Sequence, residues 1–158
     1  MKLHLLPAML VLIVITSGSL LNAQQAGLNI SGTEHEIDSI FCVMIKAAES
    51  LDANKLASGV DDRHHTGFIS NNIYYSDFKN LVETFKYNSQ GIESQQINID
   101  KKKITVLPEN VVILTATGKS SVKTIDGSTF NAPFFWSFVF EKIEGEWKVI
   151  HSHQSVKQ

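Results

Sequence analysis

The feature that most constrains this chain is its C-terminal stretch, which has the pattern of two long strands joined by a tight turn. Residues 134–141 are Phe-Phe-Trp-Ser-Phe-Val-Phe-Glu, and residues 147–155 are Trp-Lys-Val-Ile-His-Ser-His-Gln-Ser. The turn formers Glu144-Gly145 lie between them. Because side chains alternate across a strand, apolar residues face both sides of the first strand. One side carries Phe134, Trp136, Phe138 and Phe140, and the other carries Phe135, Ser137 and Val139.

A sheet with apolar residues on both faces must have both faces covered. The segments that precede it along the chain can supply helices for one face. A symmetric partner sheet is the simplest cover for the other. The pattern therefore predicts a homodimer whose sheets pack back to back.

The first half of the chain is predicted to be helical in three places. Apolar residues recur at helical spacing from Ile37 to Leu51, and Thr33 with Glu36 has capping-box spacing at the start of this helix. A short helix over residues 52–57 and another that begins at Ser76 follow. Between these two, the pattern indicates a polar loop over residues 61–67 and a strand over residues 68–75 with a turn at Asn71-Asn72.

After Gly91 the pattern changes to extended runs separated by turn formers. Helices that precede an antiparallel meander predict an α+β fold, in which a cone-shaped, curved antiparallel sheet wraps around the N-terminal helices. We expect one domain over residues 33–158, preceded by a flexible leader over residues 24–32. The predicted strands are 92–100, 103–107, 111–123, 129–141 and 146–156.

The N-terminal residues 1–23 have the pattern of a cleaved signal peptide. Lys2 precedes an apolar run from Leu5 to Ile15, and small residues lead to Ala23. The run is shorter than the roughly 20 residues that span a bilayer. We therefore expect a secreted or periplasmic protein that makes no membrane contact after signal cleavage.

Charge and cysteine content exclude several classes of function. The formal net charge is −2, so we expect no nucleic-acid partner. Lys101-Lys102-Lys103 is the only basic cluster, and we interpret it as the solvated end of a strand or a turn. Cys42 is the single cysteine, which excludes an internal disulfide, and its place beside Phe41 predicts a buried apolar side chain.

Two histidines are the strongest candidates for catalysis. His151 and His153 are two residues apart on a predicted strand, so both imidazoles lie on one face. One could act as a general base while the other orients a substrate. The alternative is a ring that bonds to the backbone, which is favoured for His151 and equally open for His153. A metal site needs a third ligand, and His64-His65 in the polar loop has the pattern of exposed residues. We therefore expect no metal and no cofactor.

Further candidates line the predicted pocket. Asp62 precedes the strand over residues 68–75, and as a carboxylate facing an apolar pocket it would be a second candidate base. A solvated acidic turn is the alternative that this pattern favours. Tyr74 and Tyr75 alternate, so one of them should face inward as a hydrogen-bond donor or as a core phenol. Trp136 and Phe138 suit the wall of a flat apolar ligand site, and ordinary core packing is the alternative.

The order of elements and the ending of the chain resemble the nuclear transport factor 2-like superfamily. More closely, they resemble its SnoaL-like branch and relatives similar to the association domain of calmodulin-dependent kinases. Residues 145–155 match a recurrent ending, Gly-x-Trp-(Lys/Arg)-hydrophobic-hydrophobic-His-x-His-x-Ser. The resemblance implies a cone whose open end leads to an apolar pocket between the concave face and the helices. It transfers no catalytic set, because the Tyr and two acids of the isomerase branch cannot all three be matched to positions here.

Three functions remain open from the sequence. The first is an exported domain that binds a small apolar or amphipathic ligand in a pocket edged by His151 and His153. The second is a cofactor-free lyase or isomerase, with His153 or Asp62 as base and an inward tyrosine as electrophile. The third is a dimerisation or interaction module without catalysis. They differ in what the pocket contains, because fold-level resemblance alone does not assign function.

Overall fold

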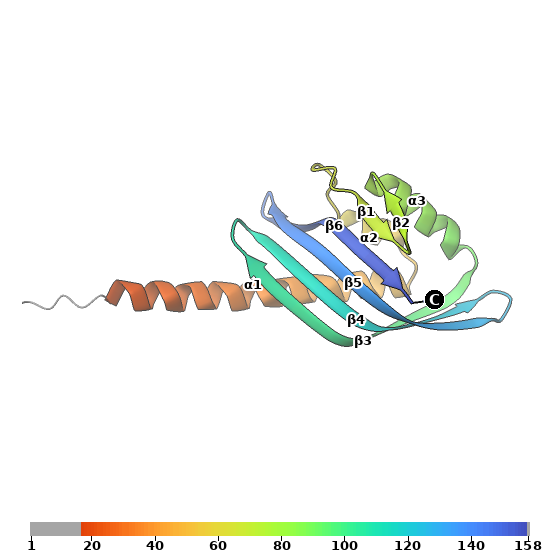
Figure 1. The fold of residues 1–158 in the computed structure, drawn as a ribbon, viewed down its shortest axis with the longest axis horizontal. Coiled ribbons are helices and arrows are strands. Elements are labelled where there is room, and N and C mark those ends of the chain that lie inside the picture. The colour runs from red at the N-terminus through yellow and green to blue at the C-terminus, as the bar shows by residue number, and fades with distance from the viewer. Residues whose placement is uncertain (1–16, 158) are drawn as a thin grey trace, which may run out of the picture.

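The computed structural model describes residues 17–157, which form three helices and one curved, unclosed six-stranded sheet (Figure 1). The helices come first, except that two short strands lie between the second and the third. The elements are α1 (Ser17–Glu49), α2 (Ala53–Ser58), β1 (Phe68–Ser70), β2 (Ile73–Tyr75), α3 (Phe78–Ser89), β3 (Ile92–Leu107), β4 (Val111–Thr124), β5 (Thr129–Ile143) and β6 (Glu146–Val156).

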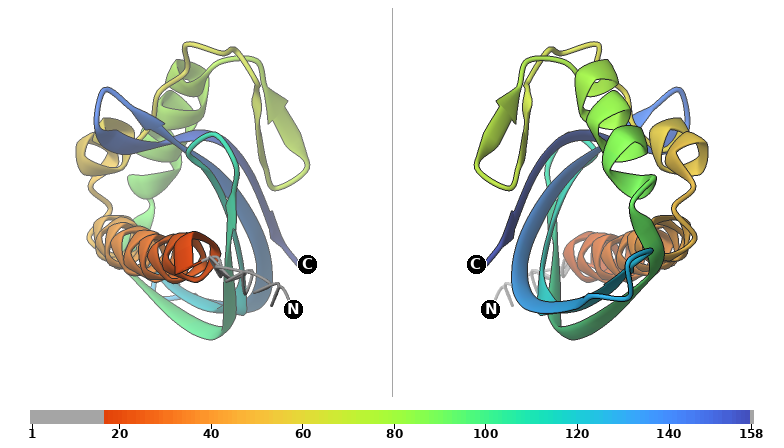
Figure 2. Two further views of the ribbon diagram at one scale, coloured as in Figure 1. Left: turned by 90° about the vertical axis from the view of Figure 1, so that its left-hand side faces the viewer. Right: turned by 90° about the vertical axis from the view of Figure 1, so that its right-hand side faces the viewer.

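The sheet has the strand order β2-β1-β6-β5-β4-β3. Neighbouring strands are antiparallel except for β1 and β6, which run parallel. Figure 2 shows α1 lying in the concave side of the sheet, with α3 near the same side. We call the face toward α1 the inner face and the opposite one the outer face. The predicted α+β fold with a curved sheet around N-terminal helices is thus confirmed.

Short-range signals determine most of the element boundaries. The Asp52 carboxylate accepts a hydrogen bond from the backbone N–H of Lys55 and caps α2, while Asp77 caps α3 in the same way. Asn71 and Asn72 both have positive φ, which produces the tight turn between β1 and β2. The hairpin between β5 and β6 turns through Glu144 and Gly145, also at positive φ. Each of these turns and caps lies at or next to a boundary that the sequence predicted.

Most boundaries differ from the sequence-based prediction by at most two residues, and two elements differ by more. The first helix begins at Ser17 rather than at Thr33, so residues 24–32 are helical and not a flexible leader. The two predicted strands over 92–100 and 103–107 are one strand, β3. A β-bulge between Ile99 and Lys101 accommodates the polar residues in between without ending the ladder to β4. The predicted signal peptide lies largely outside the described residues.

The core lies between α1 and the inner face. Ile37 and Phe41 of α1 are buried against inner residues of all four long strands. Cys42, one position further round the helix, is exposed, so the prediction of a buried thiol was wrong. The buried inner residues are Ile97, Val112, Leu114, Ala116, Phe134, Phe138, Phe140 and Val149.

Candidate functional site

The register between β5 and β6 determines where the two histidines lie. His153 pairs with Ser137, and His151 pairs with Val139. Both partners alternate along β5 with the buried Phe138, which belongs to the inner face. The two histidines therefore share a face, as predicted, but it is the outer face. The expectation that they edge a pocket on the concave side does not agree with this register.

The two imidazoles also differ in their partners. The Nδ1 atom of His151 lies 2.8 Å from the carbonyl oxygen of Gly67, and because a carbonyl only accepts, Nδ1 carries the donated hydrogen. His151 thus fastens β6 to the loop before β1. His153 is exposed on the solvent side of the sheet. A structural role is therefore visible for His151.

The polar loop over residues 61–67 lies against the end of the β5–β6 hairpin. The Arg63 guanidinium bonds to the Asp61 carboxylate at 2.8 Å, and the hydrogen bonds from Arg63 lower the pKa of Asp61. The Nε2 atom of His64 lies 2.7 Å from the Glu141 carboxylate of β5. Within the described residues, no group of three potential ligands is positioned to hold a metal ion.

Asp62 belongs to the polar loop over residues 61–67, and its carboxylate contacts the first residue of α3. Its Oδ2 atom accepts a hydrogen bond of 2.8 Å from the backbone N–H of Phe78, the first residue of the helix. Its Oδ1 atom is buried and has no hydrogen-bond partner in the structure. The Phe78 ring in turn packs on Phe68 of β1 at 5.1 Å. Asp62 therefore holds the first turn of α3 near the sheet, and the structure does not bring it together with either histidine through a hydrogen bond.

The two tyrosines separate as the alternation requires. Tyr75 pairs with the fully buried Phe68 and is itself only 9% exposed, which places it on the inner face. Tyr74 pairs with Ile69, is 65% exposed, and lies across Gly67 on the other side. Tyr75 is thus the inward tyrosine that the sequence left open.

Four uncharged polar side chains lie on the part of the inner face that β2, β5 and β6 form. We call Tyr75, Trp136, Ser152 and Gln154 the inner polar cluster. Trp136 pairs with Gln154, and Ser152 pairs with Phe138 on one side and Phe68 on the other. The amide nitrogen of Gln154 donates to the Ser152 hydroxyl at 3.3 Å, which leaves the hydroxyl hydrogen and the amide oxygen of this pair available.

Aromatic rings pack on both sides of Trp136 in this cluster. The Trp136 ring stacks on Phe134 with 3.8 Å between ring centroids and meets the edge of Phe138 at 6.3 Å. Trp136 and Phe138 thus lie on the inner face, where the prediction of a ligand wall requires them. Sequence reasoning missed Ser152 and Gln154, although alternation from the two histidines pointed to both.

The cover over this part of the inner face is incomplete. None of the residues of α3 is fully buried, and the helix packs on α2, β1 and β2 rather than along the long strands. The apolar stripe of α3, which lies on the concave side of the sheet (Figure 2), is therefore only half-buried. The half-buried stripe consists of Phe78, Leu81, Val82 and Phe85.

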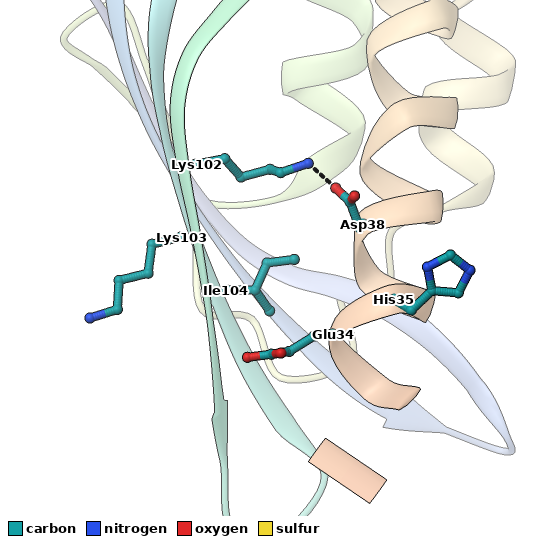
Figure 3. Close-up of a pocket in the computed structure, with 6 residues that line it drawn as sticks. All are labelled: Glu34, His35, Asp38, Lys102, Lys103 and Ile104. Atoms are coloured by element: carbon teal, nitrogen blue, oxygen red, sulfur yellow. Dashed lines mark hydrogen bonds and ion pairs between the residues drawn. The ribbon is translucent and has the colours of Figure 1, made fainter. Parts of the chain in front are cut away.

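A separate hollow of about 430 Å³ opens between α1 and β3 (Figure 3). Lys102 points across it and forms an ion pair with Asp38 of α1, while Lys103 points away. Glu34, His35 and Ile104 complete its lining. The hollow is wide open and its central charges are already paired, so we place the candidate site at the inner polar cluster and not here.

Comparisons with known proteins agree with this fold. The family model described as a SnoaL-like domain matches residues 37–157, so the chain belongs to the SnoaL-like family. No curated protein matches the chain. The fold is similar to a nuclear transport factor 2-like superfamily protein from Salmonella enterica, with 17% identity, a TM-score of 0.74, and 82% of this chain and 94% of that chain covered.

Two further solved structures show how varied the proteins with this fold are. The association domain of CaMKII from C. elegans has 11% identity and a TM-score of 0.63, with 79% of this chain and 96% of that chain covered. A hexachlorocyclohexane dehydrochlorinase (LinA) Type2 has 10% identity and a TM-score of 0.70, with 84% and 90% covered. At these identities the likeness shows the fold alone. Function must come from the site.

Proposed function

We propose that this SnoaL-like protein binds a small, uncharged, amphipathic ligand between α3 and the inner polar cluster. The observation that carries the proposal is the placing of Ser152 and Gln154 among stacked aromatic rings. Ser152 is only 2% exposed and already accepts a hydrogen bond from Gln154, but its hydroxyl hydrogen has no acceptor among the described residues. The cluster offers hydroxyl donors and an amide acceptor without any charge, which suits a neutral ligand with a polar group.

Matched substitutions test this proposal. Titration of the purified protein with N-phenyl-1-naphthylamine, a neutral apolar fluorophore, should give saturable binding. Gln154→Ala should weaken it about fivefold, because one hydrogen bond contributes about 1 kcal/mol. Gln96→Ala makes the same chemical change at an exposed position of β3 and should leave the dissociation constant unchanged. Equal dissociation constants for Gln154→Ala and Gln96→Ala would place binding elsewhere.

The enzymatic alternative needs a base beside this cluster. His153 lies on the outer face, and the Asp62 Oδ2 atom is bonded to the backbone of α3. A lyase or isomerase that uses His153 would therefore have to work on the outer face. Native mass spectrometry of protein from its own source identifies any co-purifying molecule. Turnover of that molecule that His153→Ala abolishes would favour the enzyme over the binding protein.

A second candidate function is self-association through the outer face. Phe135 is 53% exposed there, and Ile113 and Val139 of the same face are half-buried. A two-fold interface must match itself, and a face whose centre is apolar meets this condition. Sedimentation should show a dimer that Phe135→Glu converts to a monomer. A monomeric wild-type protein at high concentration would refute this proposal.

Export stays a proposal as well. It is supported by the basic, apolar and small-residue pattern of residues 1–23, and the helix in which residues 17–23 lie does not test it. Within the described part of the chain, no helix combines the length and the apolar character that crossing a membrane requires. N-terminal sequencing of the protein from its native host should begin after Ala23, and an intact Met1 would contradict cleavage.

A further inference from the structure

The two edges of the sheet are very different. At one edge, β2 has three residues. At the other edge, β3 has sixteen, and one side of its backbone faces no other strand of the part of the chain that the structure describes. A long free edge is a template for pairing with another chain, and proteins that remain unaggregated protect such edges. The length of β3 therefore requires an explanation of what keeps it unpaired.

The first part of this edge is protected by α1. The Glu49 side chain accepts a hydrogen bond of 2.9 Å from the backbone N–H of Ile97, and the Gln95 side chain donates to the carbonyl oxygen of Ala48 at 3.3 Å. Beyond Ile97, the described residues contribute no further side-chain bond to the β3 backbone. The second half of the edge needs another form of protection.

Three lysines occupy that second half. The prediction that Lys101-Lys102-Lys103 ends a strand was wrong, because all three pair with residues of β4 just past the centre of β3. Lys102 turns inward to Asp38 and lies over the ring of Phe41. Lys101 and Lys103 pair with Thr117 and Thr115 on the outer face, and neither belongs to an ion pair among the described residues.

The lysines lie inside the strand, so they would repel the lysines of a second copy that paired with it. If two copies paired antiparallel along β3 with Lys102 opposite Lys102, residues 97–107 would overlap and Lys101 of each copy would lie opposite Lys103 of the other. The central segment 100–103 holds one aspartate and three lysines, so it carries a net positive charge in each copy. Like charges opposite each other destabilise a strand pair. The bulge beside Asp100 also interrupts the regular spacing that a partner strand needs.

We propose that Lys101 and Lys103 prevent β3 from pairing with the β3 strand of a second copy. The partner that this edge excludes is thus a second molecule of the same protein. The proposal does not depend on the ligand or on the outer-face dimer. It gives the basic cluster a role that needs no anionic ligand, in agreement with the negative net charge of the whole chain.

The test uses the variant Lys101→Thr/Lys103→Thr in the Phe135→Glu background, which removes association through the outer face. Threonine favours strands, so circular dichroism should show an unchanged melting temperature. Sedimentation should show a mass that rises with concentration toward twice that of the parent. The control Lys119→Thr/Lys157→Thr removes the same charge from exposed positions that do not belong to the edge strand and should keep the parent mass.

Two further measurements do not depend on the double variant. High sodium chloride screens the lysines, so the parent should gain mass when the salt is raised. Glu49→Ala exposes the Ile97 N–H and should add to the association of the lysine variant, whereas Glu49→Gln keeps an acceptor and should not. The proposal is overturned if the lysine variant keeps the parent mass at all concentrations, or if the control gains as much mass.

Discussion

The inner and outer faces of the sheet are built from alternate residues of the same strands, yet they have different roles. Phe134 is fully buried on the inner face, while its neighbour Phe135 is about half exposed on the outer face. Ser152 is buried between two histidines that face the other way. The difference teaches that residue type alone does not identify the site on this sheet. A polar residue points to a site only when it faces α1 and α3, because it is buried there and polar groups are rarely buried without a partner.

The largest expected effect compares the two faces directly. Phe138→Ala removes a buried ring that contacts Phe41 and Trp136, and should lower the free energy of unfolding by about 3–5 kcal/mol. Phe135→Ala should lower it by less than about 1 kcal/mol, as is usual at the surface. Urea unfolding monitored by circular dichroism measures both. Equal losses would mean that the outer face is covered in solution.

A second prediction concerns the one glycine on the inner face of β4. A Cβ atom at Gly118 would overlap the carbonyl oxygen of Asn98 and the ring of Phe134. Gly118→Ala should therefore cost about 1–3 kcal/mol through strain, although alanine is a small residue. Gly127→Ala is the control for overlap, because a Cβ atom there meets nothing, although its positive φ carries a smaller strain of its own. A Gly118→Ala protein as stable as the wild type would show that the strands separate easily.

A third prediction tests the attachment of the inner-face cover. Asp62→Ala removes the acceptor for the Phe78 N–H and should cost about 1 kcal/mol, as the loss of a helix cap does. Asp62→Asn keeps an acceptor and should cost less. Hydrogen exchange should become faster in the first turn of α3 for the alanine variant. Unchanged exchange there would mean that the packing of Phe78 holds the helix without Asp62.

A fourth prediction compares the two outer-face histidines. His151→Ala loses the hydrogen bond to Gly67 and should cost about 1 kcal/mol. His153→Ala should change stability by less than about 0.5 kcal/mol, since the side chain is exposed. Thermal melting of both variants at the same pH measures the two losses of stability. A large loss for His153→Ala would assign it a structural role that the structure does not show.

The smallest expected effect lies at the rim, where α1 meets β6. The hydrogen bond from Trp147 and the charge of Lys142 lower the pKa of Glu36. A pKa lowered by folding stabilises the folded state fully above the ordinary glutamate pKa of about 4.3, and this contribution is lost as the pH falls through the lowered value. Glu36→Gln should therefore lose slightly less stability than the wild type on acidification below that pH. The free energy of unfolding of both proteins is measured by denaturation at several pH values. An equal pH dependence for the wild type and Glu36→Gln would contradict this prediction.

Much of the fold was accessible from local patterns. The end of α2, the turn at Asn71-Asn72 and the bounds of β6 follow from caps, turn formers and alternation, which act within a few residues. The single strand β3 was not accessible, because its polar centre reads as a break until β4 supplies a ladder. The start of α1 was missed for a similar reason, since polar residues such as Gln24 and Gln25 do not mark a helical face.

The candidate site divides in the same way. The sequence by itself determined that His151 and His153 share a face, that Tyr74 and Tyr75 do not, and that the strand pair of β5 and β6 is apolar on both sides. Only the tertiary structure decided which face is the inner one. Alternation has a period of two residues and fixes relative sides, whereas the absolute side depends on where α1 packs and on the bulge that sets the register of β6. That choice placed the histidines outside and placed Tyr75, Ser152 and Gln154 inside.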